Sequence, residues 1–274
     1  MSTRAPLIRF IGGGNMASAL IGGLVNTGHP ADRVQVIEPD AAARTRLHVQ
    51  SGVSANASAE GLPACDIAVL AVKPQLLRGV AREHAASLTE ALVVSVAAGI
   101  RLPDLARWLG GHSRIVRAMP NTPALVGHGV TGLAASAGVS DGDRSAVQAL
   151  FDAVGTVVWV DGDAGIDLVT AISGSGPAYM MLMVEALTEA GVGQGLSAER
   201  AQQLALGTMA GAVALMQSSE ETPATLRERV TSPGGTTERG IAAMQAGHFA
   251  GIMADAVTAA RVRAGELGDL FGKD

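Results

Sequence analysis

The stretch Phe10-Ile11-Gly12-Gly13-Gly14-Asn15-Met16-Ala17 decides how this chain folds. An apolar run, Leu7–Ile11, leads into it, and a segment of helical character, Met16–Thr27, follows it. The first run predicts a buried strand and the second a helix, so the glycines between them form the connecting turn. A glycine-rich strand–turn–helix of this form is typical of a dinucleotide-binding α/β fold, and the alternative is a plain glycine-rich turn.

The small residues of this turn have separate predicted tasks. Gly12 allows the tight turn, Gly14 lets a pyrophosphate come close to the backbone, and Ala17 is small enough for the helix to pack on the strand. Free N–H groups and the dipole at the start of the helix attract the phosphates. We therefore predict that Gly12, Gly14, Asn15 and Met16 contact a dinucleotide cofactor.

Strand-like and helix-like segments alternate as far as Val160. Several strand candidates are short, continuous apolar runs, as expected for strands that are buried on both faces of a parallel sheet. The predicted strands are Leu7–Ile11, Val34–Ile37, Ile67–Val72, Leu92–Ala97, Arg114–Ala118, Val130–Ala134 and Thr156–Val160. The predicted helices between them are Met16–Thr27, Ala41–Gln50, Gln75–Ala86, Leu102–Leu109 and Asp143–Ala153. This alternation predicts an α/β fold with an N-terminal, Rossmann-like doubly wound sheet that has helices on both faces.

The pattern changes after Asp161, where we expect no further strand. The remaining segments all have helical character: Ile166–Ser173, Pro177–Ala190, Ala198–Gln217, Ala224–Val230, Thr236–Ala246 and Phe249–Leu270. We therefore predict two domains, a dinucleotide-binding domain over residues 1–162 and an all-helical domain over residues 163–274. Ser197 and Thr222 are the expected N-caps of two of these helices.

Composition excludes several classes of protein. Of the 274 residues, 48% are hydrophobic and only 16% are charged, which is enough for a core and argues against a disordered chain. A net charge of -5 without any basic tract argues against nucleic-acid binding. No run approaches the roughly 18 apolar residues of a membrane helix, and the apolar run at the N-terminus is too short for a signal peptide. We therefore expect no membrane association and a cytoplasmic protein.

Neither thiol nor metal chemistry is expected. Cys65 is the only cysteine, so that an intrachain disulfide and a zinc cluster of thiolates are both impossible. It stands beside an apolar strand, which favours a buried, unreactive thiol over a reactive one. The six histidines are scattered without the spacing of metal ligands, and we predict no metal site.

One late helix, Ala198–Gln217, is apolar almost all round. Its large apolar residues are Leu204, Leu206, Met209, Val213, Leu215 and Met216. Such a helix must be buried, and a domain of about 110 residues has difficulty burying it alone. Two explanations remain open: an alanine-rich core helix, or burial by a second subunit, which we favour. In the preceding helix, Met180, Met181 and Met183 are expected to lie in the core.

Charged residues follow the second strand. Glu38 stands about 20 residues after Ala17, where an acidic side chain can hold the ribose 2′-hydroxyl of NAD and an arginine would favour the 2′-phosphate of NADP. Glu38 therefore indicates NAD, whereas Arg44 and Arg46 could meet a phosphate instead. The alternative is that these charges only keep the surface soluble.

Three further strand ends are expected to line the cofactor cleft, because the carboxyl ends of parallel strands form the ligand crevice. A nicotinamide ring could lie against the backbone of the last two. Lys73, at the first of them, is one of only two lysines, although a strand-end lysine can also simply reach solvent. The predicted cofactor residues at these ends are Ala71, Val72, Lys73, Pro74, Ala97, Ala98, Gly99 and Asn121.

Two motifs lie in the predicted helical domain. Ser173–Tyr179, Ser-Gly-Ser-Gly-Pro-Ala-Tyr, has small residues that would let a helix start approach the cofactor domain, unless it is an ordinary interdomain turn. Val230–Glu238, Val-Thr-Ser-Pro-Gly-Gly-Thr-Thr-Glu, is a loop of hydroxyl residues and glycines that leads into a helix. The N–H groups at such a helix start suit a small carboxylate, and the alternative is a plain N-capped loop.

These segments together resemble the pyrroline-5-carboxylate reductases. Leu226–Thr237, which reads Leu-Arg-Glu-Arg-Val-Thr-Ser-Pro-Gly-Gly-Thr-Thr, is similar to the signature of that family and is far more specific than the glycine turn. The likeness extends through Phe10–Ala17, Ala71–Gln75, Arg117–Pro123 and Ser173–Tyr179, in the order and spacing of the family. It covers essentially the whole chain.

The resemblance implies a reaction and an assembly. A nicotinamide cofactor, usually NADPH in this family although many members accept NADH, transfers hydride to the imine carbon of pyrroline-5-carboxylate and gives L-proline, the last step of proline biosynthesis. The helical domain would intertwine with that of a second subunit in a homodimer, and often five dimers form a decamer. The residues that the resemblance assigns to the substrate are Ser232, Gly234, Gly235, Thr236 and Thr237, and we also predict a substrate contact for Ser175. The catalytic residue would be Thr237, with its hydroxyl beside the ring nitrogen.

Two positions depart from the pattern of the family. Family members commonly have an asparagine shortly before the strand near Asp66, and both Asn56 and Ser58 could take that place beside the cofactor. Glu38 leaves the preference for a 2′-phosphate open.

No motif places a histidine or a cysteine as an acid or a nucleophile. An iminium is already electrophilic and its nitrogen can be protonated before it binds, so the protein mainly supplies positioning and a shielded pocket. One rival, a two-domain hydroxyacid dehydrogenase, generally needs a catalytic lysine in the helical domain, but the only lysine after Gly162 is Lys273. The other rival, a nucleotide-binding or scaffold protein without activity, would not need both an intact cofactor turn and an intact anion loop.

Overall fold

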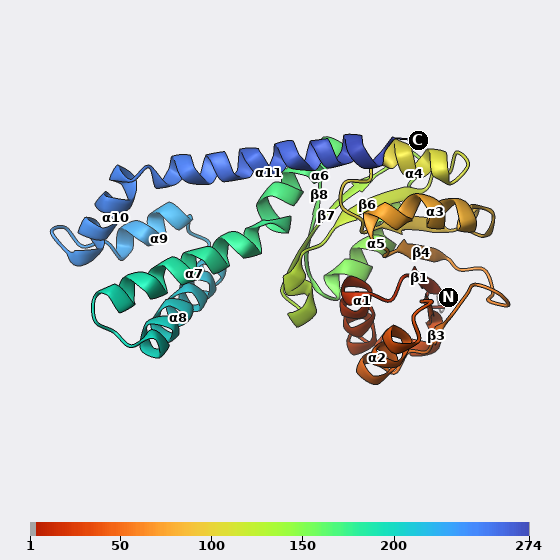
Figure 1. Ribbon diagram of the computed structural model, residues 1–274, viewed down its shortest axis with the longest axis horizontal. Helices are drawn as coiled ribbons and strands as arrows, with labels where there is room; N and C mark the ends of the chain where they lie inside the picture. The colour runs from red at the N-terminus through yellow and green to blue at the C-terminus, as the bar shows by residue number, and fades with distance from the viewer. Residues whose placement is uncertain (1–3, 274) are drawn as a thin grey trace. The chain divides into compact units, whose positions relative to one another are not determined.

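The computed structural model describes residues 4–273. It consists of two compact units. The first comprises the residues up to Ser175 and those from Ala259 onward, and the second comprises Gly176–Thr258. All strands of the described chain lie in the first unit, and the second is built from helices (Figure 1). The predicted boundary at residue 162 lies at the start of helix α6 (Gly162–Val169), whereas the two compact units divide after Ser175 and again before Ala259.

Eight strands form one sheet in the order β3-β2-β1-β4-β5-β6-β7-β8. Their bounds are β1 Ile8–Ile11, β2 Val34–Ile37, β3 Ala55–Asn56, β4 Ile67–Leu70, β5 Leu92–Ser95, β6 Ile115–Met119, β7 Gly129–Ala135 and β8 Gly155–Trp159. Neighbouring strands are parallel except β6 and β7, which pair antiparallel. All the predicted strands are present, and the predicted Rossmann-like sheet is confirmed. Only β3 was not predicted, because two residues are too few to show a pattern.

The strand order creates a switch point beside β1. From β1 the chain moves outward through β2 to β3, and it then returns to the opposite side of β1 to form β4. Ile8 accordingly pairs in parallel register with Val34 on one side and with Ile67 on the other. A ligand crevice forms at the carboxyl ends of the strands at such a switch point.

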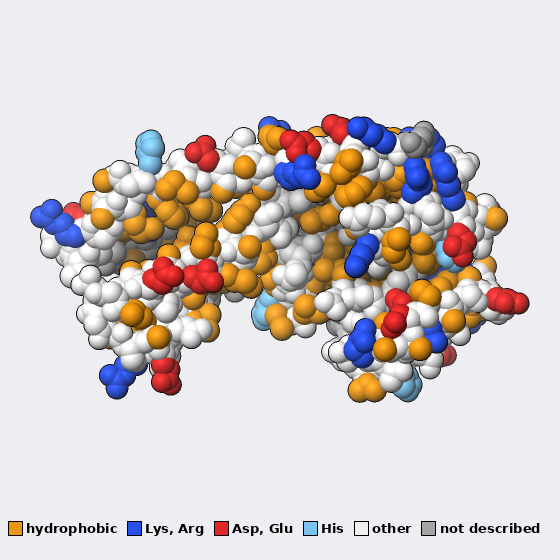
Figure 2. All heavy atoms as spheres, viewed as in Figure 1, with side chains coloured by type: hydrophobic (Ala, Val, Ile, Leu, Met, Phe, Trp, Pro, Cys, Tyr) orange, Lys and Arg blue, Asp and Glu red, His pale blue; other side chains and the backbone are white. Residues whose placement is uncertain are grey.

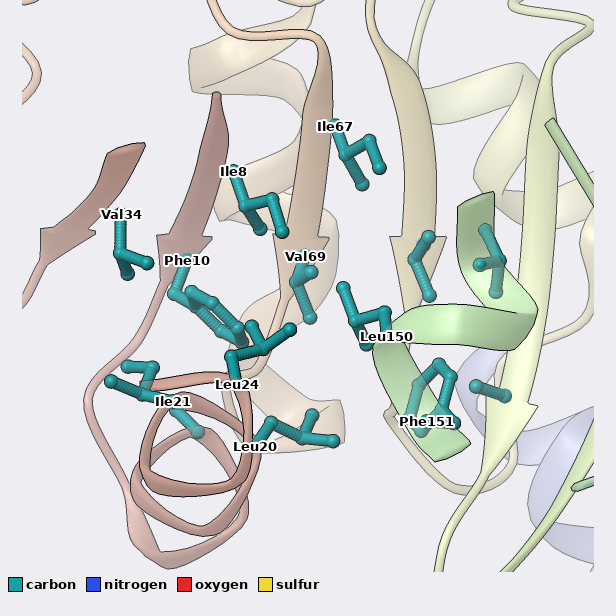
Figure 3. Packing of buried hydrophobic residues seen from close by; sticks show 14 of the residues in the cluster. Ile8, Phe10, Leu20, Ile21, Leu24, Val34, Ile67, Val69, Leu150 and Phe151 are labelled. Atoms are coloured by element: carbon teal, nitrogen blue, oxygen red, sulfur yellow. The ribbon is translucent and has the colours of Figure 1, made fainter. Parts of the chain in front are cut away.

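Helices cover both faces of the sheet, as predicted. Their bounds are α1 Asn15–Asn26, α2 Ala41–Ser51, α3 Pro74–His84, α4 Leu102–Trp108 and α5 Asp141–Asp152. Helices α1, α2 and α5 pack on one face, and α3 and α4 on the other. Figure 3 shows Leu20, Ile21 and Leu24 of α1 packed against Phe10 in the first of these layers. Phe10 is fully buried, a burial that stabilises the fold by roughly 1.5–3 kcal/mol.

Every element after Trp159, up to residue 273, is helical. After α6 come the π-helical segment η4 Thr170–Gly174, α7 Gly176–Gly193, α8 Ala198–Gln217, α9 Pro223–Arg229, α10 Thr236–Ala246 and α11 Phe249–Phe271. The Ser197 side chain accepts from the Arg200 N–H at the start of α8, and that of Thr222 from Thr225 N–H at the start of α9, so both predicted caps are confirmed. None of the helices within residues 4–273 is long and apolar enough to cross a membrane.

Helix α8 is not a core helix of the single chain. It packs beside α7 (Figure 1), yet the only residues that it buries are Ala201 and Ala205. Leu204 and Leu206 remain 59% and 58% exposed. The prediction that the methionines of α7 lie in the core is wrong for the single chain, since Met181 is 63% exposed. Hydrophobic side chains accordingly stand out on the visible surface of the Gly176–Thr258 unit (Figure 2). Of the two explanations for α8, burial in its own core is therefore excluded.

Candidate functional site

The glycine turn after β1 is fixed at one glycine and open at another. Gly12 has φ +103°, and a Cβ on it would lie 2.6 Å from the carbonyl oxygen of Ala71, so that only glycine fits. The Gly12 N–H donates to the carbonyl oxygen of Ile37 over 2.8 Å, which ties the turn to the end of β2. At Gly14, by contrast, φ is -71° and no atom lies within 4 Å of the Cβ position.

Helix α1 begins directly after this open position. Gly14 is its N-cap and has no side chain to satisfy the first N–H groups of the helix. Those groups, which include Asn15 and Met16, have no acceptor within the helix and suit an anion, which the helix dipole also favours. Ala17 is fully buried, which is the close helix–strand packing that its small size predicts.

A cleft of about 510 Å³ opens at the carboxyl ends of β1, β2 and β4, at the switch point of the sheet. The predicted cofactor residues that line it are Gly12, Gly14, Glu38, Ala71, Val72 and Lys73. Residues from three separate strand ends are thus brought together, and the topology rule for ligand crevices correctly located the cleft.

Helix α3 forms a wall of this cleft that the sequence analysis missed. Leu76, Val80 and Glu83 line the cleft, and their spacing of four and three residues places them on one face of the helix. Pro74 is the first residue of α3, so the Lys73-Pro74 pair starts the helix that carries this wall. The spacing of Leu76, Val80 and Glu83 in a helix that starts directly after a strand end was the signal available in the sequence.

His84 and Cys65 contribute no charge to the first unit at neutral pH. His84 also lines the cleft, but burial lowers the pKa of its imidazole below the ordinary 6.5, and the ring is neutral. Burial raises the pKa of the Cys65 thiol, which fits the buried, unreactive cysteine that was predicted. Among residues 4–273, no group of three or more His, Cys, Asp or Glu side chains is placed to hold a metal ion.

Glu38 lies at the end of β2 with both carboxylate oxygens hydrogen-bonded. Oε2 accepts from the Gly13 N–H over 2.8 Å, and Oε1 accepts from the Asp40 N–H over 2.9 Å. Glu38 also packs on the glycine turn, since a Cβ on Gly13 would lie 3.1 Å from the Cβ of Glu38. Arg44 donates to the carbonyl oxygens of Glu38 and Pro39, over 2.8 Å in each case.

Asn56 and Ser58, the two candidates for a cofactor contact near β3, differ in their position relative to the cleft. The carbonyl oxygen of Asn56 accepts from the Glu38 N–H over 2.9 Å, in the β2–β3 pair. The next residues, Ala57, Ser58 and Ala59, line the cleft, whereas Asn56 does not. Ser58 is therefore the better placed of the two.

The turn after β5 packs against the C-terminal helix. Gly99 has φ +71°, and a Cβ on it would lie 3.0 Å from the Phe271 ring and 3.1 Å from the Leu267 side chain. Arg101 pairs with Asp269 over 2.7 Å and strengthens the same contact. The glycine therefore serves the packing of α11 in the first unit. Ala97, Ala98 and Gly99 do not line the cleft described above.

Asn121 acts as a clamp after β6. Its Nδ2 donates to the carbonyl oxygen of Ser173, and its Oδ1 accepts from the Val130 N–H, over 2.9 Å in each case. The side chain is buried, so it joins the turn after β6 to the Ser-Gly-Ser-Gly segment rather than facing solvent. Part of that segment is η4, and π-helical turns are frequent at functional sites. The Ser175 hydroxyl donates within this segment, to the carbonyl oxygen of Thr170 over 3.1 Å.

In the second unit, the loop before α10 has an open helix start. Gly235 is the N-cap and has no capping side chain, and a Cβ on it would lie 2.9 Å from the carbonyl oxygen of Ser232. Gly234 takes the left-handed φ of +73°. Thr236 and Thr237 form the exposed first turn of α10. The first N–H groups of α10 thus have no side-chain cap, and the binding of an anion by this loop stays a prediction.

Glu238, in the first turn of α10, has a role that the sequence analysis did not assign. Its Oε2 accepts from the Gly234 N–H over 2.8 Å and so holds the loop to α10. It stands three residues after the N-cap Gly235, where a glutamate commonly reaches back over a helix start, and that spacing was the available signal. The Gly235 N–H also donates, to the carbonyl oxygen of Ser232 over 3.0 Å, so an incoming anion meets a loop in which the N–H groups of both glycines are already bonded.

Two family models match the chain. The model described as pyrroline-5-carboxylate reductase dimerisation matches residues 163–267, and the model described as NADP oxidoreductase, coenzyme F420-dependent, matches residues 7–99. The first covers α8 and its exposed apolar surface. The chain therefore forms a homo-oligomer, which supports the second explanation for α8, burial by another subunit.

Several relatives resemble the chain over all or nearly all of its length. It is 45% identical to the pyrroline-5-carboxylate reductase of Pseudomonas aeruginosa, with 100% of each chain covered. A solved pyrroline-5-carboxylate reductase from Coxiella burnetii superposes with a TM-score of 0.92 at 40% identity and covers 96% of this chain and 99% of its own. A Plasmodium falciparum pyrroline carboxylate reductase, solved with NADP bound, superposes with a TM-score of 0.83 at 32% identity. The match covers 96% of this chain and 98% of the Plasmodium chain.

Proposed function

Because this chain belongs to the pyrroline-5-carboxylate reductase family, we propose that it reduces 1-pyrroline-5-carboxylate to L-proline with NAD(P)H. The observation that carries the proposal is that one chain pairs the open glycine turn at Gly14 with the Ser-Pro-Gly-Gly-Thr-Thr loop before α10. The turn suits the diphosphate of a dinucleotide, and the loop suits a small carboxylate.

A spectrophotometric assay tests this function. The imine is added to the purified protein with NADPH or with NADH, and oxidation of the cofactor is followed by absorbance. We expect oxidation that depends on the imine with at least one of the two cofactors. Failure with both cofactors would refute the proposal. Oxidation of the cofactor with a 2-keto acid, and not with the imine, would indicate a hydroxyacid dehydrogenase.

The first unit supplies the proposed cofactor site. The free N–H groups at Gly14, Asn15 and Met16 are suited to the diphosphate, and Gly12 gives the turn its shape. The ribose end is assigned to Glu38 and to the segment after β3. Another wall of the site is assigned to the residues after β4, which are Ala71, Val72, Lys73 and Pro74. The nicotinamide end is assigned to Ala97, Ala98, Gly99 and Asn121. Bound NAD(P)H supplies the hydride, and the residues of the chain hold it in place.

The second unit supplies the proposed substrate loop. Hydride adds to the carbon of the C=N bond, the electron pair of that bond moves to nitrogen, and the protonated nitrogen becomes the amine of proline. The free N–H groups at the start of α10 and the Ser232 side chain are assigned to the carboxylate, and Gly234 and Gly235 shape the loop around it. The Thr237 hydroxyl is assigned to the ring nitrogen. Thr236 and Ser175 complete the proposed set. No acid–base residue is required, since the iminium arrives protonated.

Thr237→Ala is expected to lower kcat/KM for the imine about three- to tenfold, because one neutral hydrogen bond contributes about 0.5–1.5 kcal/mol. The dissociation constant for NAD(P)H should stay within about twofold. Steady-state kinetics and a fluorescence titration measure the two quantities. Thr237→Ser retains the hydroxyl and should recover most of the activity. Wild-type turnover by Thr237→Ala, or a loss of cofactor affinity instead, would contradict the assignment.

The assembly that we propose is a homodimer in which the partner covers α8, with five such dimers as a possible decamer. Light scattering at micromolar concentration should give a mass at least twice the 27.6 kDa of one chain. Leu206→Glu places a charge at a 58% exposed apolar position and should lower that mass, whereas Gln202→Glu, an exposed polar position of the same helix, should not. A wild-type mass of one chain would contradict this assembly. A cytoplasmic location remains a prediction from the sequence.

A further inference from the structure

The carboxylate of Glu38 stands at the ribose end of the cofactor cleft. It follows β2 directly and lines the cleft together with Gly12, Gly14 and Ser58. In dinucleotide-binding folds an acidic residue at this point accepts hydrogen bonds from the ribose hydroxyls next to the adenine. We infer that Glu38 makes this chain select NADH over NADPH, an inference that rests on the proposed function because it needs a nicotinamide dinucleotide at the glycine turn.

The carboxylate is held in place before any ligand arrives. One oxygen accepts from the Gly13 N–H over 2.8 Å and the other from the Asp40 N–H over 2.9 Å. A carboxylate oxygen can accept two hydrogen bonds, so each of them keeps one acceptor position. Two ribose hydroxyls, at the 2′ and 3′ positions, can use those positions without reorganising the side chain. A site that is fixed in advance loses little entropy on binding.

A 2′-phosphate meets negative charge at the same place. It would bring nearly two negative charges beside Glu38, which is costly where like charges are close. The start of α2, which could otherwise bind a phosphate, is already filled, because Asp40 Oδ1 accepts from the Ala43 N–H over 2.6 Å. Glu38 and Asp40 thus place two carboxylates at the end of β2.

The guanidinium of Arg44 does not offset these carboxylates in the present arrangement. Arg44 uses one terminal nitrogen to donate to the carbonyl oxygens of Glu38 and Pro39, both over 2.8 Å. It is therefore directed at the backbone beneath the turn, and binding a phosphate through that nitrogen would break both bonds. Lys73 lines the cleft after the end of β4, and its ammonium group suits the diphosphate that both cofactors share.

Direct binding measurements on the wild-type protein test the inference first. Calorimetric titrations with NADH and with NADPH, at the same ionic strength, give two dissociation constants that do not depend on activity. We expect NADH to bind at least about fivefold more tightly. Equal affinities, or tighter binding of NADPH, overturn the inference while leaving the proposed function intact. If neither cofactor binds, the proposed function fails and this inference fails with it.

Variants then test whether Glu38 is the cause. Glu38→Ser removes the charge and the ribose contacts, so NADH should bind about tenfold more weakly, and the ratio of NADPH to NADH dissociation constants should fall about tenfold or more. Glu38→Asp retains a carboxylate and should keep the preference for NADH. Glu83→Gln removes the same charge from another wall of the same cleft and should leave the ratio within about twofold. A ratio that Glu38→Ser does not change, or that Glu83→Gln changes as much, overturns the role of Glu38.

Discussion

Gly14→Val is expected to abolish NAD(P)H binding in a protein that remains folded. No atom lies within 4 Å of the Cβ position, and a φ of -71° with a ψ of -176° is open to any residue. The valine side chain therefore fits the free protein and occupies the space that the diphosphate needs. Two charge-assisted hydrogen bonds at about 1.5–3 kcal/mol each would be lost, so affinity should fall at least about a hundredfold. A fluorescence titration with NADPH measures it.

Two further glycines make this experiment specific. Gly22→Val is the matched control, because Gly22 also has nothing within 4 Å of its Cβ position, lies in the same helix and does not line the cleft. It should bind the cofactor within about twofold of wild type. Gly12→Val should instead fail to fold stably, since φ is +103° and Cβ would lie 2.6 Å from a backbone oxygen. Wild-type affinity in a folded Gly14→Val protein would rule out the glycine turn as the cofactor site.

Gly235→Val is expected to remove imine reduction while cofactor binding survives. A Cβ on Gly235 would lie 2.9 Å from the carbonyl oxygen of Ser232, so the loop before α10 must shift, and the start of that helix loses its open face. All the proposed carboxylate contacts are affected together, so kcat/KM should fall more than about a hundredfold, compared with three- to tenfold for Thr237→Ala.

Cofactor affinity separates this effect from general unfolding. Gly235 lies in the second unit and the cofactor turn in the first, so NAD(P)H should bind Gly235→Val within about twofold of wild type. Gly240→Val, which carries the same substitution further along α10 where nothing lies within 4 Å, should retain activity within about threefold. Full activity of Gly235→Val, or an equal loss in Gly240→Val, would show that the substrate loop is assigned wrongly.

Local pattern was enough for the elements and for the glycine turn. Short, mainly apolar runs predicted every strand of more than two residues, because a strand that is buried on both faces is apolar at most of its positions. Helix α8 has the predicted bounds because Ser197 provides an N-cap next to a continuous helical segment. The demand for glycine at position 12 was also visible, since the turn between a strand and a helix is itself a local structure.

The composition of the site depended on residues that are distant in the chain. Glu38 was visible at a strand end, but its bond to Gly13 exists only because β2 lies beside β1. The wall from α3 and the preference for Ser58 over Asn56 depend likewise on how segments meet around the cleft. Gly99, predicted for the cofactor, is required by packing against Phe271, which lies at the far end of the sequence.

The sequence by itself thus determined the order and type of the elements, the glycine turn and the hydroxyl-rich loop, because each is specified by neighbouring residues. Only the tertiary structure decided which strand ends share a cleft, that Asn121 is used as a clamp to Ser173, and that Met181 is exposed. The physical reason is that burial and hydrogen-bond partners are properties of pairs of surfaces. An apolar pattern shows that a side chain must be covered, but it does not say whether its own chain or another one covers it.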